Sequence, residues 1–156
     1  MSVTEKARRC LLALKQQGKK IAFAESCTGG LLAKLLTDLG GASEVFECGI
    51  VSYSNKIKHS LLGVSKETLD TYTAVSEPTA KEMAAGVRRI SGADVGVSVT
   101  GYAGPDGENV GLIYVGISHN KTTSVYRLEL YEDMTRTERR EFAAGVAFDK
   151  VTELFK

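Results

Sequence analysis

The sequence predicts an α/β protein, a three-layer α/β/α sandwich with a mixed, mostly parallel sheet. Segments with helical and strand-like patterns alternate through most of the chain, and two strand-like segments then follow each other directly near the carboxyl end. Glycine-rich turns come directly after two of the strand-like segments. The length of 156 residues fits a single domain, 1–156, that can bury a substantial core.

The first third of the chain predicts two helices and two strands. An apolar stripe predicts a helix over Val3–Gln17, with Gly18 as its stop. The short apolar run Ile21–Ala24 predicts a buried strand, and leucines at helical spacing then predict a helix over Leu31–Leu39. The β-branched and aromatic residues of Val45–Tyr53 predict the second strand.

The rest of the chain predicts three more strands and several helical segments. In chain order these are a short helix capped by Ser54 or Asn55 and ended by Gly63, helical turns over 65–72, a helix from Ser76 to Ile90, strands over Asp94–Thr100, Val110–Ser118 and Thr122–Leu130, and a helix over Thr135–Phe155. The short connection around Asn120 predicts a hairpin between the last two strands.

Composition excludes several classes of function. Twenty basic against 19 acidic residues leave a net charge of +1, so we expect no nucleic-acid partner and no membrane partner. The charged opening and the absence of a long apolar run predict neither a signal peptide nor a membrane span. Cys10, Cys27 and Cys48 lack the spacing of a metal site or a disulfide framework, so we expect no metal, and the thiols fit a reducing cytoplasm.

One glycine-rich turn connects the first predicted strand to its helix. The start of a helix presents unpaired N–H groups and a positive dipole end, and Gly29 and Gly30 leave that backbone accessible. The turn therefore predicts a place for an anion, or for an oxygen that becomes one, beside Ser26, Cys27 and Thr28. The alternative is an ordinary helix cap with glycines for close packing. Neither the phosphate-loop pattern nor the G-x-S-x-G pattern is present.

A polar cluster, Tyr53–Lys58, follows the second predicted strand. Lys58 lies about one helical turn beyond Asn55, so the two side chains are predicted to share a face. A partly desolvated lysine loses its proton more easily and can act as a base, and Ser plus Lys is a known alternative to Ser-His-Asp. The alternative for Lys58 is a solvated helix lysine. Cys27 is an alternative nucleophile, or else an inert buried thiol.

Two further groups are candidates for binding. Thr100 and the N–H groups of Gly101, Ala103 and Gly104 can form an anion nest, or the loop can simply need positive φ. If the strands before this loop and before the Ser26 turn are parallel, both loops meet at one edge of the sheet. Arg136 and Arg140 are four residues apart and can grip a phosphate, or else form surface ion pairs.

Four segments together resemble the successive motifs of the CinA C-terminal domain family, the nicotinamide mononucleotide deamidases. They are Ala24-Glu25-Ser26-Cys27-Thr28-Gly29-Gly30, Tyr53-Ser54-Asn55 with Lys58, Ala74-Val75-Ser76-Glu77-Pro78, and Gly101-Tyr102-Ala103-Gly104-Pro105-Asp106-Gly107. The resemblance covers nearly the whole chain in order. It implies an α/β/α domain that hydrolyses the carboxamide of nicotinamide mononucleotide to nicotinate mononucleotide and ammonia, a reaction of pyridine-nucleotide salvage, by a Ser/Lys mechanism without metal or cofactor. The resemblance also implies homo-oligomers, dimers or higher, and the length resembles that of stand-alone members.

The resemblance also implies roles for individual residues. Ser26 would be the nucleophile and Lys58 its base, with Tyr53 assisting proton transfer. The oxyanion and substrate site would be shaped by Thr28, Gly29, Gly30, Asn55, Thr100, Gly101, Ala103 and Gly104, and we add a phosphate role for Arg136 and Arg140.

The sequence departs from the family pattern at two places. The loop after Gly107 is shorter than usual, and the usual Gly-Asp before Arg136 is missing. The short loop keeps two alternatives open, a nucleotide-binding regulatory module without turnover and an amidase for another small carboxamide. A redox role of Cys27 is a further, more distant alternative.

Overall fold

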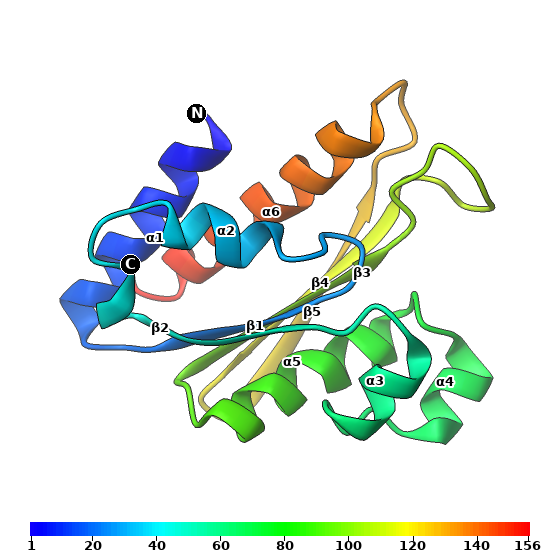
Figure 1. Ribbon diagram of the computed structural model, residues 1–156, viewed down its shortest axis with the longest axis horizontal. Coiled ribbons are helices and arrows are strands. Elements are labelled where there is room, and N and C mark those ends of the chain that lie inside the picture. Colours follow the sequence, from blue (N-terminus) through cyan, green and yellow to red (C-terminus); the bar gives the residue numbers. More distant parts are fainter.

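The computed structural model describes residues 1–156 and shows one five-stranded sheet with helices on both faces (Figure 1). The strands are β1 (Ile21–Glu25), β2 (Phe46–Val51), β3 (Val95–Gly101), β4 (Leu112–His119) and β5 (Thr122–Glu129), and their order in the sheet is β2-β1-β3-β4-β5. β1 pairs in parallel with both β2 and β3, whereas β4 and β5 add on in antiparallel fashion. The predicted three-layer fold with a mixed sheet is confirmed.

Helices cover both faces of the sheet. They are α1 (Val3–Gln17), α2 (Leu31–Thr37), the 3-10 turn η1 (Ala42–Glu44), α3 (Asn55–Ser60), α4 (Lys66–Tyr72), α5 (Glu77–Ser91) and α6 (Arg136–Glu153). Figure 1 shows α1, α2 and α6 on one face and α5, with the short helices α3 and α4 beside it, on the other. None of these helices combines the length and apolar character needed to cross a bilayer.

Element boundaries differ from the predicted ones by a few residues where the chain has to turn. β2 ends at Val51 rather than Tyr53, because the chain then enters α3, where Ser54 accepts a hydrogen bond from the N–H of Ile57. β4 begins at Leu112 rather than Val110, because Gly111 bends the backbone with φ of +103°. α6 begins at Arg136, with Thr135 outside the helix as the first half of a capping box.

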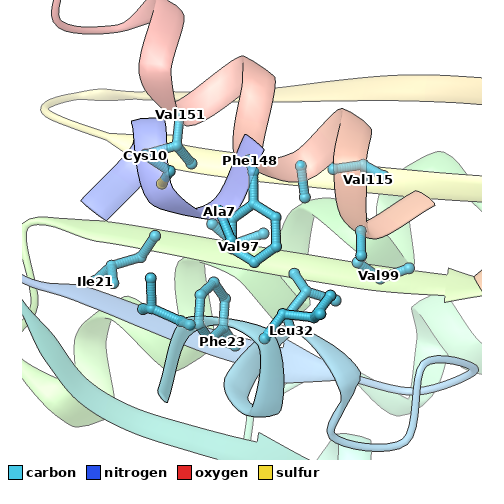
Figure 2. Close-up of a cluster of buried hydrophobic side chains, with 14 of the residues drawn as sticks. Ala7, Cys10, Ile21, Phe23, Leu32, Val97, Val99, Val115, Phe148 and Val151 are labelled. Atoms are coloured by element: carbon cyan, nitrogen blue, oxygen red, sulfur yellow. The ribbon is translucent and has the colours of Figure 1, made fainter. Parts of the chain in front are cut away.

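The larger apolar core lies between the sheet and the layer of α1, α2 and α6. Phe23 of β1 and Phe148 of α6 both lie in this core (Figure 2). Their rings are arranged edge to face, with centroids 6.2 Å apart. All five residues of β1 are buried, as are the first six of β3. The two central strands are thus held on both faces, so the loops that leave their carboxyl ends start from a rigid base.

Candidate active site

The two glycine-rich loops meet at one edge of the sheet. β1 and β3 are neighbours and parallel, so the turn after Glu25 and the loop after Gly101 leave from the same edge, as predicted. They share a cavity of about 240 Å³. Its lining residues are Ser26, Cys27, Tyr53, Lys58, Ala74, Val75, Thr100, Gly101, Tyr102, Ala103, Gly104, Asp106 and Arg136.

Ser26 is fixed by the main chain on both sides. Its N–H donates to the Val99 carbonyl at 2.9 Å, which continues the pairing of β1 with β3 for one residue. Its carbonyl accepts from the N–H of Gly29, and Gly29 and Gly30 follow with φ of +59° and +107°. A side chain at either glycine would strain this turn, so the glycines serve the backbone conformation that presents Ser26.

The start of α2 is already occupied by a side chain of the protein. The Glu25 carboxylate, which is buried, accepts hydrogen bonds from the N–H groups of Leu32 at 2.9 Å and Ala33 at 3.1 Å. The N–H groups of Leu32 and Ala33 are therefore not free for a ligand, and the anion place predicted for this turn does not include them. The ordinary-cap alternative is wrong, because the cap residue is Gly30 and makes no side-chain hydrogen bond.

The free donors of this turn lie slightly earlier in the chain. The N–H groups of Cys27 and Thr28 have no acceptor within the protein, although both residues are buried. The Thr28 hydroxyl is also buried without a hydrogen-bond partner. Buried donors of this kind are rare in folded proteins. The turn therefore offers two main-chain donors next to the Ser26 hydroxyl.

Lys58 reaches the Ser26 hydroxyl from the other face of the sheet. Its Nζ lies 2.9 Å from Oγ of Ser26, 2.7 Å from the Ser52 carbonyl and 3.2 Å from the Tyr53 carbonyl. Lys58 is only 1% exposed and makes no ion pair. When the amine is neutral, the two carbonyls take its two N–H groups and its lone pair faces Ser26. The solvated-lysine alternative is wrong.

Burial makes this amine a base at moderate pH. Desolvation of the ammonium lowers the pKa of Lys58 from its ordinary value of 10.5 to about 8. A substantial fraction of the side chain is therefore neutral just above neutral pH. The site needs no histidine, and both histidines lie outside the cavity.

The lowered pKa of Lys58 predicts a pH-dependent stability. Between pH 8 and 10.5 the unfolded chain still carries this proton while the folded protein has lost it. The free energy of unfolding therefore rises with pH across that window, by about 3 kcal/mol at roughly 1.4 kcal/mol per pH unit. Below pH 8 both states carry the proton, and the cost of burying the ammonium is present in full.

Urea unfolding of wild type and Lys58→Met at pH 7 to 10.5 measures this contribution. The wild type should gain stability over the variant as pH rises, whereas Lys56→Met, at an exposed lysine two residues away, should run parallel to the wild type. A constant difference between wild type and Lys58→Met would contradict the lowered pKa.

The loop after β3 is short but closed. The N–H of Tyr102 donates to Leu112 and the N–H of Gly111 donates to Tyr102, so the loop returns directly into β4. Asp106 of this loop lines the cavity. Thr100 donates its hydroxyl to the Ala74 carbonyl at 2.7 Å, which ties the loop before α5 to the cavity. The shortened loop therefore still forms a wall of the site.

The two predicted arginines of α6, Arg136 and Arg140, make different contacts. Arg136 lines the cavity and donates to the Gly104 carbonyl at 2.6 Å and to the Tyr53 hydroxyl at 3.2 Å. Arg140 does not line it. Its Nε and Nη2 instead donate to the carbonyls of Cys27 at 3.0 Å and Thr28 at 2.6 Å. The two arginines thus share a helix face, as predicted, but contact different loops.

Other predicted site residues do not contact the Ser26–Lys58 pair, and several do not line the cavity. The Tyr53 side chain is 62% exposed at the rim, and its hydroxyl bonds Arg136 rather than Ser26 or Lys58. Asn55 is exposed and lines a separate hollow between α3 and α4. Thr28, Gly29 and Gly30 are not among the lining residues, but they directly follow Ser26 and Cys27, which are.

Cys27 lines the cavity as a protonated thiol. Burial raises its pKa to about 12, against the opposing effect of the Arg140 and Arg136 charges. A thiol with this pKa is a poor nucleophile at neutral pH, so the geometry favours Ser26. No group of three or more His, Cys, Asp or Glu side chains is placed to hold a metal ion.

Three features of the site were missed in the sequence. Glu25 is not among the predicted site residues, although its carboxylate caps α2. Arg139 belongs to the basic cluster of Arg136, Arg139 and Arg140 and has no predicted role, although it is buried and donates to three carbonyls. Ala74 and Val75 line the cavity. For these two the signal was present, since they open one of the four motifs quoted above.

Comparisons with known proteins agree on one family. The family model of the CinA C-terminal domain matches residues 3–155. A CinA-like protein of Kosmotoga olearia is 46% identical over 142 residues, which cover 88% of this chain and 34% of that protein. The chain spans about a third of the length of the curated relatives of this longer kind.

A shorter relative and a crystal structure are also similar. The nicotinamide-nucleotide amidohydrolase PncC of Enterobacter agglomerans is 54% identical over 110 residues, which cover 68% of this chain and 67% of that protein. The competence/damage inducible protein CihA of Agrobacterium tumefaciens has a TM-score of 0.94 and 38% identity, and the match covers 99% of this chain and 96% of that one.

Proposed function

This chain belongs to the CinA C-terminal domain family, and we propose that it hydrolyses the carboxamide of nicotinamide mononucleotide to nicotinate mononucleotide and ammonia. The single observation that carries the proposal is the contact between Ser26 Oγ and Lys58 Nζ, at 2.9 Å within a cavity beside unpaired N–H groups. The substrate is suggested by the similarity to a nicotinamide-nucleotide amidohydrolase.

The proposed reaction has two halves. In the first, Oγ of Ser26 adds to the carboxamide carbon while Lys58 takes the hydroxyl proton, and main-chain N–H groups stabilise the oxyanion. The C–N bond then breaks, and Lys58 returns its proton to the leaving nitrogen, which departs as ammonia. In the second half, water gives a proton to Lys58 and attacks the acyl-serine ester. The acid is released and Ser26 recovers its proton.

The charges around the cavity suit a nucleotide phosphate. Arg136 is the one arginine among the lining residues, and none of the five ion pairs of the structure neutralises it. It is exposed, and two polar contacts hold it against the cavity wall. A guanidinium in this position can donate two parallel hydrogen bonds to a phosphate. We therefore assign the phosphate end of the substrate to Arg136.

Removal of Arg136 should weaken substrate binding far more than it slows the chemistry. Arg136→Ala is expected to raise KM for nicotinamide mononucleotide about 10- to 100-fold and to change kcat only a few-fold, because a charge-assisted hydrogen bond contributes about 1.5–3 kcal/mol. Steady-state ammonia release with nicotinamide mononucleotide and with its riboside separates the two effects.

The riboside lacks the phosphate, so Arg136→Ala should leave its turnover close to that of the wild type. Arg127→Ala serves as the control, because Arg127 is an exposed arginine on β5 that is paired with Glu129. Equal losses with both substrates would contradict the phosphate assignment.

The test of the proposed function is ammonia release by the purified, chelator-treated protein. Nicotinamide mononucleotide is expected to be converted, and mass spectrometry should show a product one mass unit heavier. Conversion of other small carboxamides but not of the mononucleotide would indicate the alternative amidase. Binding of the mononucleotide without release would indicate a binding module.

A further inference from the structure

The guanidinium groups of two arginines of α6 donate their hydrogen bonds to main-chain carbonyls. Arg139 is 6% exposed and donates to the carbonyls of Leu130, Ala103 and Glu132, at 3.0, 3.2 and 3.0 Å. Arg140 donates to the carbonyls of Cys27 and Thr28. Neither takes part in an ion pair. Such placements are costly, since a buried charge is normally paired, and the reaction proposed above uses neither residue.

The contact with Arg140 sets the direction of one peptide plane beside the nucleophile. The Cys27–Thr28 peptide is trans, so its C=O and N–H groups point in opposite directions. Arg140 holds the Cys27 carbonyl toward α6 at 3.0 Å, and the N–H of Thr28 therefore points away from α6. Lys58 reaches the site from α3 on the opposite face of the sheet (Figure 1). This N–H has no acceptor in the protein.

Arg139 sets a second peptide plane in the same way. It holds the Ala103 carbonyl, and the Ala103–Gly104 peptide is also trans, so the N–H of Gly104 points away from α6. That N–H too has no acceptor, and both Ala103 and Gly104 line the cavity. The unpaired N–H groups of Thr28, in the turn after β1, and of Gly104, in the loop after β3, thus both point away from α6. Adjacent arginines of α6 set these two directions.

We propose that Arg140 and Arg139 are positioning residues that aim the N–H groups of Thr28 and Gly104 at the oxygen of the carbonyl that Ser26 attacks. The inference rests on the proposed function in taking Ser26 as the nucleophile, but it does not depend on the identity of the substrate. A charged donor on each carbonyl also polarises the peptide and makes its N–H a stronger donor. Arg140 thereby acts through the main chain and not on the substrate phosphate.

The test uses p-nitrophenyl acetate, which has a reactive carbonyl and no phosphate. The rate of p-nitrophenol release that depends on Ser26 is measured as the difference between each protein and the same protein carrying Ser26→Ala. Arg140→Met is expected to lower this acylation rate about 100-fold at saturating ester, because loss of one oxyanion donor costs about 10²- to 10³-fold in rate. The KM for the ester should stay within about 3-fold of the wild-type value. Arg140→Lys should be intermediate, because an ammonium cannot reach both carbonyls as the planar guanidinium does.

Two controls separate positioning from loss of structure. Arg88→Met removes an arginine that also donates to a main-chain carbonyl, that of Asn120, far from the cavity, and should keep the wild-type rate. Circular dichroism and thermal unfolding report folding. If Arg140→Met does not fold, Arg140→Lys decides the question, with an expected loss of about 10-fold in acylation rate. Arg139→Lys tests the orientation of the Ala103–Gly104 peptide in the same assay, where a loss in acylation rate is likewise expected.

The outcomes distinguish this inference from the proposed function. Arg140-dependent acylation without ammonia release from the mononucleotide would support the positioning role and overturn the proposed substrate. A folded Arg140→Met or Arg140→Lys protein that reacts at the wild-type rate would overturn the positioning role and leave the proposed function standing. Absence of Ser26-dependent acylation in the wild type, together with no ammonia release, would overturn both.

Discussion

Replacement of Ser26 by alanine is expected to lower ammonia release from nicotinamide mononucleotide by a factor of about 10⁴ or more. Ser26 is the one hydroxyl that Lys58 Nζ contacts, at 2.9 Å, so its loss removes the covalent route altogether. Nucleophile replacements in serine hydrolases leave the residual catalysis of the oxyanion donors and of substrate binding. The measurement is a coupled ammonia assay at saturating substrate, with isothermal titration of the mononucleotide to show that binding persists.

Cys27→Ser is the matched control for Ser26→Ala. It alters the neighbouring side chain in the same turn, whose thiol stays protonated because burial raises its pKa to about 12. The Cys27→Ser protein should keep activity within a few-fold of the wild type. If it loses activity while Ser26→Ala keeps it, the roles of the two residues are reversed and the redox and thiol alternatives reopen.

Local patterns were sufficient to predict the fold because each pattern agreed with the tertiary structure. The alternation of helix and strand patterns predicted the layers, and the short Asn120 connection predicted the antiparallel addition of β5 to β4. The placement of both glycine-rich loops at one edge followed from the parallel pairing of β1 with β3. Errors of one to three residues arose where caps and positive φ decide a boundary, as at Gly111.

The site was harder to predict because its contacts depend on orientation. Helical spacing placed Asn55 and Lys58 on one face, yet Lys58 is buried against Ser26 while Asn55 stays exposed. α3 has only six residues, so the way it meets the sheet decides which side chain enters. Glu25 shows the same limit, because a carboxylate at the end of a strand gives no local sign that it will cap the following helix.

The roles of the arginines illustrate a different limit. Spacing predicted that Arg136 and Arg140 share a face of α6, and they do. It could not predict that one lies in the cavity while the other binds the carbonyls of the turn behind it. Nor does spacing reveal Arg139, because a buried arginine that binds only carbonyls has no charge partner in the sequence to indicate it.

Replacement of Lys58 by methionine is expected to lower kcat about 10³- to 10⁴-fold. Methionine fills similar space without a base, so the loss is chemical and not a matter of packing. Lys58→Arg should be as inactive, because a guanidinium does not give up its proton at accessible pH. The double variant Ser26→Ala, Lys58→Met should be no slower than the slower single variant, because the two residues act as one unit. Additive losses would contradict the proposed pair.

The pH dependence of kcat/KM tests the protonation state that this mechanism requires. Lys58 must be neutral to accept the Ser26 proton, and its pKa of about 8 implies that log kcat/KM rises with unit slope below pH 8 and levels off above it. A rate independent of pH from 6 to 9 would exclude Lys58 as the base.

A buried amine held by two carbonyls has no carboxylate to keep it charged, so the same desolvation that lowers the stability of the fold below pH 8 also makes the amine a base. The site thus obtains its base from burial rather than from an imidazole, and the levelling-off of kcat/KM and the onset of the rise in stability should both lie near pH 8.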